Sequence, residues 1–166
     1  MLKKEKEKLF IKNYNIYKDK IYTYFLYRIN FNKELAEDLT SEVFLKAFKS
    51  MDSFDSERSF QSWIYTISRN HLFNYYRDCD KVVNLDAAKD AAVEFRKMFA
   101  AKIDLEIVVA IIYQMDDYCR EVLLLRFVDG LDNQEIAEML EKEEGAVRTQ
   151  ISRALSELRK KINKMN

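Results

Sequence analysis

Hydrogen-bonding side chains near the end of the chain recur at spacings that place several of them on one face of a helix. They are Arg148, Thr149, Gln150, Ser152 and Arg153. In the major groove of DNA, arginine can hydrogen-bond guanine and glutamine can hydrogen-bond adenine. From Gly145 to Met165 the stretch has six basic residues and one acidic residue, a net charge of +5. These residue types and this charge predict contact with a nucleic acid.

The elements that position these side chains are predicted to be two helices joined by a tight turn. Asp132 with Glu135 three residues later forms a capping-box pattern, which predicts a short helix that ends near Leu140. A second helix is expected from near Gly145 to about Asn163. Its apolar residues step by threes and fours: Val147, Ile151, Ala154, Leu155, Leu158 and Ile162. This pattern indicates a helix-turn-helix, although the stretch alone also fits an ordinary helical hairpin with a solvated charged face.

The composition indicates a mainly helical protein. The 166 residues include no proline and only two glycines. Tight β-turns, P-loops and dinucleotide-binding turns commonly require glycine, so folds built on them are not expected. Hydrophobic residues make up 48% of the chain, enough for the core of one domain or of two small ones. We therefore expect an all-α fold.

Charge and ligand-forming residues narrow the function classes. Basic and acidic residues balance at 28 each, so a nucleic-acid role must rest on local clustering. Cys79, Cys119 and the single His71 are isolated, which predicts reduced thiols, no metal site and no cofactor. No nucleophile, base and orienting group cluster together, so we expect neither an enzyme nor a small-molecule substrate. No apolar run reaches membrane-spanning length, so we expect no membrane insertion. We expect a cytoplasmic location instead.

The first half of the chain shows three further helical patterns. Aromatic and apolar residues recur at helical spacing from Phe10 to Ile29, and Asn32 can cap a helix over Lys33–Ser50. A third pattern covers Phe60–Arg77, in which we expect Trp63 and Ile67 to belong to the core. In the second half, helices are expected over Ile103–Gln114 and Asp117–Phe127, with Gly130 stopping the latter. Their core is expected to contain Leu123, Leu124, Phe127, Val128, Ile136, Leu140 and Val147.

Two motifs resemble a known family. LAEDLTSEVFLKAF at residues 35–48, followed by WIYTISRN at 63–70, resembles the first conserved domain of bacterial sigma factors of the extracytoplasmic-function group. REVLLLRFVDG at 120–130, followed by EIAEML and GAVRTQISRAL, resembles their second. The resemblance implies two small helical domains, residues 1–78 and 103–166, joined by a linker at 79–102, with the helix-turn-helix in the second. Residues 85–101 favour a helix, whereas family linkers are looser, and the sequence leaves both open.

The resemblance also implies a function. The chain would be an alternative sigma factor that binds core RNA polymerase, directs it to specific promoters and helps to open the DNA. Its partners would be core polymerase, promoter DNA and an anti-sigma factor. Two alternatives stay open: a sigma-derived helix-turn-helix regulator that does not engage polymerase, and a helical interaction module that binds neither.

The family pattern assigns three groups of site residues. The polymerase would contact the helix over residues 33–50 through Asp38, Glu42, Phe44 and Phe48. The minus-ten element would be melted and held by Arg58, Ser59, Phe60, Arg69, Asn70, Asn74 and Arg77. The minus-thirty-five element would be read by the five polar residues of the last helix, Arg148 to Arg153.

The turn between the last two helices departs from the family pattern. It reads Glu141-Lys142-Glu143-Glu144, where the family usually has glycine, an apolar residue and a small polar residue. Acidic residues at this end favour the helix through its dipole but repel an approaching phosphate. We therefore expect weak DNA binding by this domain on its own, and we expect Lys142 to loosen the turn.

Overall fold

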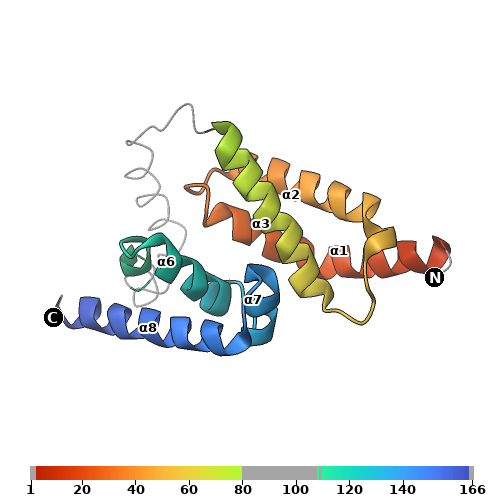
Figure 1. Ribbon diagram of the computed structural model, residues 1–166. Coiled ribbons are helices and arrows are strands. Elements are labelled where there is room, and N and C mark those ends of the chain that lie inside the picture. The colour runs from red at the N-terminus through yellow and green to blue at the C-terminus, as the bar shows by residue number, and fades with distance from the viewer. Residues whose placement is uncertain (1–2, 80–107, 109, 165–166) are drawn as a thin grey trace. The chain divides into compact units, whose positions relative to one another are not determined.

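Helices form all the secondary-structure elements of the described residues. The computed structural model describes residues 3–79, 108 and 110–164, and the chain divides into two compact units, Met1–Asn84 and Leu85–Asn166 (Figure 1). The prediction of an all-α chain is confirmed within these residues. The predicted linker lies outside them, except for Cys79, and so does the helix-prone segment 85–101. Among the described helices, none has the length and apolar character needed to cross a membrane.

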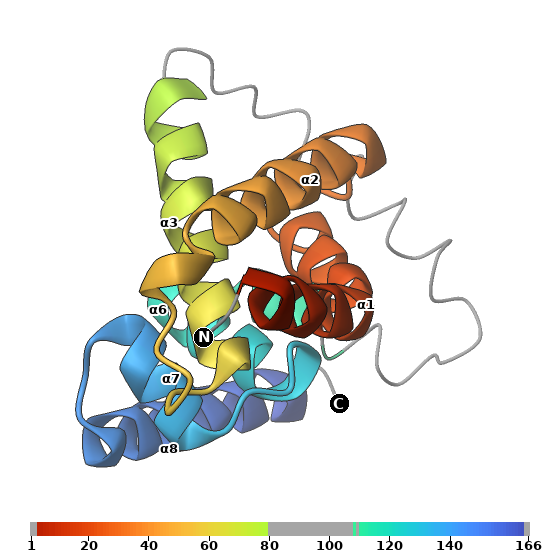
Figure 2. The same ribbon diagram turned by 90° about the vertical axis from the view of Figure 1, so that its right-hand side faces the viewer.

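The first unit packs three long helices around an aromatic and aliphatic core. These are α1 (Lys3–Leu26), α2 (Lys33–Lys49) and α3 (Phe60–Cys79), with a short 3₁₀ turn, η1 (Met51–Ser53), after α2. Each long helix contacts the other two, and Figure 2 looks nearly along α1 with α2 and α3 beside it. The most buried side chains follow the helical period on each helix: Ile21, Tyr24, Phe25, Val43, Ala47, Ile64 and Tyr65.

The turn between α1 and α2 is set by local chemistry. Asn30 and Phe31 have φ angles of 56° and 58°, the left-handed region in which asparagine is better tolerated than most residues. Phe31 is buried against Tyr27, and this burial offsets the backbone cost. Asn32 then caps α2 by accepting a hydrogen bond of 3.1 Å from the Leu35 amide. The predicted cap is confirmed.

The second unit contains α6 (Asp117–Leu123), α7 (Asn133–Leu140) and α8 (Glu144–Asn163). Helical backbone also occurs at residues 108 and 110–113, within the predicted helix over Ile103–Gln114, whose first residues lie outside the described ranges. The predicted capping box of α7 is present, with Asp132 Oδ1 accepting from the Glu135 amide at 2.8 Å. Gly130, with φ of 74°, ends the preceding helical segment as expected.

The prediction for the segment before Gly130 is wrong. The segment expected to be α-helical to Phe127 changes at η2 (Leu124–Val128) into a π-helical turn, in which the Asp129 amide donates to the Leu124 carbonyl at 2.9 Å. A π turn holds an extra residue and so rotates the side chains that follow it. Leu123 and Leu124 are buried as expected, but Phe127 is 59% exposed and is not part of the core.

Candidate nucleic-acid and polymerase interfaces

Helix α8 separates an apolar face from a polar one. Its buried side chains are Val147, Ile151, Ala154 and Leu158, and the helix packs against α6 and α7. Of the predicted contact residues, Arg148, Thr149, Ser152 and Arg153 are exposed. Gln150 is only half-buried, with its amide oxygen shielded from solvent and without a hydrogen-bond partner among the described residues. The helix thus presents four polar side chains, with two arginines among them, to an external partner.

Acidic residues lie close to the predicted contact residues at the start of α8. Arg148 Nη2 donates to Glu144 Oε1 at 3.0 Å, an ion pair one helical turn long. Thr149 Oγ1 donates to the Gly145 carbonyl, also at 3.0 Å. Glu144 thus occupies one of the five N–H donors of Arg148 and places a negative charge beside the guanidinium.

The turn before α8 is held more firmly than its sequence suggested. Glu141 ends α7 in the left-handed conformation, with φ of 54° and ψ of 47°, where glycine would carry no steric cost. Lys142 Nζ donates to the Tyr118 hydroxyl on α6 at 2.6 Å and lies 4.4 Å from the centre of that ring. The expectation that Lys142 loosens the turn is therefore wrong, because its side chain fastens the turn to α6.

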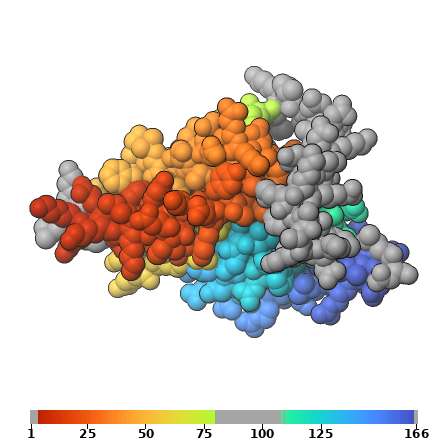
Figure 3. Space-filling model, turned by 180° about the vertical axis from the view of Figure 1, so that it is seen from behind, coloured from red at the N-terminus to blue at the C-terminus, as the bar shows by residue number. Residues whose placement is uncertain are grey.

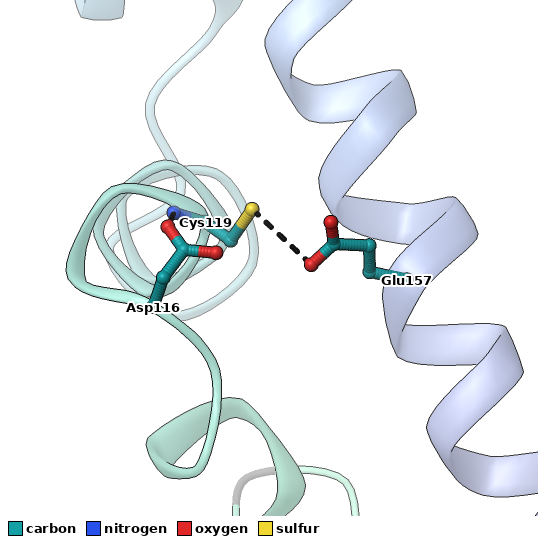
Figure 4. A group of neighbouring side chains, drawn as sticks. All are labelled: Asp116, Cys119 and Glu157. Atoms are coloured by element: carbon teal, nitrogen blue, oxygen red, sulfur yellow. Dashed lines mark hydrogen bonds between the residues drawn. The ribbon is translucent and has the colours of Figure 1, made fainter.

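Asp116, Cys119 and Glu157 form a small polar cluster between α6 and α8 (Figure 4). Asp116 Oδ1 caps α6 by accepting from the Tyr118 and Cys119 amides at 3.1 and 3.0 Å, and the Cys119 amide lowers the pKa of Asp116. The Cys119 thiol donates to Glu157 Oε2 at 3.8 Å. Partial burial, reinforced by Asp116 and Glu157, raises the pKa of Cys119 to about 12. The contacts of Asp116 and Cys119 make the cluster a helix cap and an interhelix contact.

The exposed face of α3 carries most of the residues predicted for the minus-ten element. Asn70, Asn74 and Arg77 are all exposed, at spacings of four and three residues. Arg69 is half-buried, and its guanidinium lies 4.6 Å from the centre of the Phe73 ring. Sequence reasoning missed Phe73, which is 55% exposed. The signal was available, since Phe73 lies between Asn70 and Asn74 and outside the buried stripe.

The loop before α3 divides into exposed and buried parts. Arg58 is exposed and Ser59 is half-buried. Phe60 is only 9% exposed and contacts the rings of Phe54 and Trp63, so it supports the loop from below. Trp63 and Ile67 are both half-buried, and Trp63 packs against the rings of Phe54 and Phe60, so they lie at the margin of the core to which they were assigned.

The outer edge of α2 combines carboxylates with exposed apolar side chains. Asp38 and Glu42 are exposed, and Phe48 is 50% exposed. Phe44 is only 4% exposed and lies 4.9 Å from the Tyr14 ring of α1, so it packs inside the unit and does not face a partner. Leu45, which sequence reasoning missed, is 54% exposed. Seen from behind, the surfaces of α1 and α2 adjoin (Figure 3).

Comparisons with known proteins identify both units. Residues 14–82 match the model of sigma-70 region 2, and residues 105–158 match that of sigma-70 region 4. The ECF RNA polymerase sigma factor SigW of Bacillus subtilis (strain 168) is 34% identical, in an alignment that covers 97% of this chain and 92% of SigW. The chain belongs to the extracytoplasmic-function group of RNA polymerase sigma factors. The function implied by the sequence motifs is confirmed: this sigma factor binds core RNA polymerase, directs it to promoters and is not an enzyme.

Solved structures agree on the fold. CnrH, in a structure with the cytosolic domain of CnrY, has a TM-score of 0.69 at 19% identity, with 96% of this chain and 91% of that chain covered. The sigma factor RpoE of Bartonella quintana, in a structure with the anti-sigma factor NepR, has a TM-score of 0.68 at 17% identity, with 94% and 98% covered. The match to region 2 favours a true sigma factor over a helix-turn-helix regulator that does not engage polymerase.

Proposed function

We propose that this sigma factor uses three surfaces, one to bind core polymerase and two to bind promoter DNA. Two of the surfaces lie on residues 1–78 and one lies on residues 103–166, and residues 79–102 link them. The outer edge of α2 docks on core polymerase. Its carboxylates, Asp38 and Glu42, suit basic side chains on the partner. Leu45 and Phe48 supply the apolar contact area that commonly dominates binding energy. Phe44 supports this edge from inside.

The loop at Arg58 and Ser59 and the exposed face of α3 hold the opened minus-ten element. Bases taken out of the duplex need polar groups for their edges and an aromatic face on which to stack. Asn70, Asn74 and Arg77 supply the polar groups. Phe60 and the half-buried Arg69 keep the loop and this face in shape.

The exposed face of α8 reads the minus-thirty-five element. The observation that carries this proposal is the division of α8 into a buried apolar face and an exposed face with Arg148, Thr149, Ser152 and Arg153. Such a helix can enter the major groove while its apolar side stays packed on α6 and α7. Gln150, being half-buried, is placed at the margin of this contact. The acidic turn makes the unit a weak DNA binder that relies on polymerase to hold it at the promoter.

Run-off transcription by holoenzyme reconstituted with each variant tests the proposal. Arg148→Ala and Arg153→Ala are each expected to reduce transcription by about five- to 150-fold, since a good bidentate base contact is worth ~1–3 kcal/mol. Arg159→Ala, in the same helix but beyond the proposed contact, is the matched control. Loss that depends on the minus-thirty-five sequence indicates base reading, whereas equal loss on all templates indicates phosphate contact. Unchanged transcription with both variants would refute the assignment.

We also propose that this sigma factor acts in the cytoplasm and is held inactive there by an anti-sigma protein. In support, RpoE of Bartonella quintana, which has a similar fold, was solved with its anti-sigma factor NepR. An inhibitor that covers the α2 edge would compete directly with core polymerase. Adding core polymerase to the purified complex should then release the inhibitor, and a stable ternary complex would contradict this form of inhibition.

A further inference from the structure

A buried histidine lies between two charged side chains of the α2 edge. His71, the only histidine in the chain, is on α3 and is 8% exposed. Its Nδ1 is 2.6 Å from Lys46 Nζ, and its Nε2 is 2.8 Å from Glu42 Oε2. Glu42 and Lys46 are one turn apart on α2, so the imidazole bridges neighbouring positions of the same helix edge.

The chemistry of the three groups fixes where the imidazole proton lies. An ammonium group can only donate, so Nδ1 must accept, and the proton of the neutral ring lies on Nε2, beside the Glu42 carboxylate. The ring is neutral at pH 7 because burial, and next the positive charge of Lys46, lower the pKa of His71, with Glu42 opposing them. From α1, the Phe25 ring packs edge-on against the imidazole and adds apolar surroundings.

This arrangement gives two solvent-facing side chains a buried partner that restricts them. The Glu42 side chain is 60% exposed, yet one of its carboxylate oxygens lies 2.8 Å from the imidazole Nε2. A partner that binds a pre-ordered side chain loses less conformational entropy than one that must order it. The other oxygen of Glu42 then remains available to a basic group of the partner.

We propose that His71 is a positioning residue for polymerase docking, which holds Glu42 and Lys46 in the arrangement that core RNA polymerase binds. The inference rests on the proposed docking role of the α2 edge. It adds to that role a residue of another helix that does not itself touch the polymerase.

The bridge makes docking sensitive to pH in one direction. When His71 gains a proton on Nδ1, it can no longer accept from Lys46, and the imidazolium pairs more strongly with Glu42. The carboxylate is then partly neutralised and Lys46 is displaced, so core polymerase should bind more weakly. Because the pKa of His71 lies below its ordinary value of 6.5, the neutral bridge persists at pH 7 and is lost only as the pH falls through that lowered pKa.

The single histidine allows the bridge to be observed directly by NMR in the intact sigma factor. We expect its imidazole signal to titrate with a midpoint below 6.5. Lys46→Met should raise the midpoint by removing the repelling charge, and Glu42→Gln should lower it. A midpoint at or above 6.5 that neither substitution moves would overturn the inference, because the bridge would then not exist in solution.

A double-mutant cycle on core polymerase affinity separates positioning from docking. We expect His71→Leu to weaken binding several-fold in the wild type and to have little further effect in Glu42→Gln. In Asp38→Asn, a control one turn earlier on the same edge, His71→Leu should weaken binding by the same factor as in the wild type. His71→Gln, which keeps a donor but does not titrate, should restore most of the affinity and flatten its dependence on pH between 5.5 and 7.5.

The outcomes distinguish the two proposals. If His71→Leu weakens binding equally in the wild type and in Glu42→Gln, His71 is merely structural and the inference fails while the docking edge stands. If Glu42→Gln and Asp38→Asn both bind as the wild type does, the docking edge itself is wrong, and the inference fails with it.

Discussion

Lys142 Nζ lies 2.6 Å from the Tyr118 hydroxyl oxygen and 4.4 Å from the centre of the same ring. The lysine belongs to the turn between α7 and α8, and the tyrosine belongs to α6. Lys142, a charged residue where the family usually has an apolar one, thus connects the turn between α7 and α8 to α6.

Removing the contact between Lys142 and Tyr118 should destabilise the second unit in two steps. Tyr118→Phe keeps the ring but loses the hydroxyl, which should cost about 0.5 kcal/mol. Tyr118→Leu loses the cation–π contact as well and should cost about 1 kcal/mol. Amide hydrogen exchange in α7 and α8 measures the effect in the full-length chain. Phe127→Leu, at an aromatic 59% exposed in the same unit, should be neutral, and a tyrosine series no different from it would show that the contact contributes nothing.

Relieving the backbone at Glu141 should stabilise the same unit. With φ of 54°, a residue that carries a Cβ is strained, whereas glycine is not. We expect Glu141→Gly to raise the free energy of unfolding by about 0.5–1 kcal/mol, after allowing for the greater freedom of glycine in the unfolded chain. Denaturant unfolding followed by circular dichroism measures it. Glu141→Gln is the matched control, since it removes the charge and keeps the Cβ; an equal gain there would point to charge and not to backbone strain.

Removing the acid that holds Arg148 should strengthen DNA binding. Glu144 pairs with Arg148 at 3.0 Å and adds negative charge where a phosphate would approach. Exposed pairs of this kind are worth ~0.2–1 kcal/mol, so Glu144→Gln should raise the affinity of the holoenzyme for promoter DNA by roughly 1.4- to fivefold. The gain should shrink as salt increases.

The control for this change is Glu138→Gln, which removes one acidic charge from α7 and does not touch the ion pair with Arg148. It should give a smaller gain than Glu144→Gln. Equal gains would mean that overall charge, and not release of Arg148, governs the affinity.

Helical periodicity was enough to predict the polar face of α8, because the burial of a helix that packs on one side follows its own repeat. It was not enough for α2. Phe44 and Phe48 are one turn apart and equally apolar, yet α1 covers the first and leaves the second 50% exposed. Which of the two is covered depends on where α1 crosses α2, and the pattern within α2 does not contain that information. The exposure of Leu45 likewise depends on where α1 crosses α2.

Two other features lay beyond sequence reasoning for different physical reasons. The π turn at Leu124–Val128 changes the hydrogen-bond step of a helix, and a run of apolar residues fits either step. That turn is why Phe127 faces solvent. The His71 bridge joins α3 to two positions of α2, so it exists only once the helices are packed. In sequence, His71 is a single apolar-face histidine, which is most simply assigned to the core.

The Cys119 thiol should react far more slowly with alkylating reagents than an ordinary cysteine. Burial, followed by the effects of Asp116 and Glu157, raises its pKa to about 12. At pH 8 its thiolate population should be roughly a thousandfold lower than that of a thiol with an unperturbed pKa. Mass spectrometry after iodoacetamide treatment can follow Cys119 and the exposed Cys79 in the same sample, with Cys79 as the internal comparison.

The raised pKa of Cys119 also makes the free energy of unfolding depend on pH. A folded state that raises the pKa of a thiol is favoured while the thiol is protonated. This contribution is complete below the unfolded pKa, near 9, and is lost as the pH rises toward 12. Cys119→Ser should therefore flatten the fall in the free energy of unfolding over this range. Alkylation of Cys119 as fast as that of Cys79 at pH 8, with a Cys119→Ser profile identical to that of the wild type, would show that Cys119 is not shielded in solution as it is in the structure.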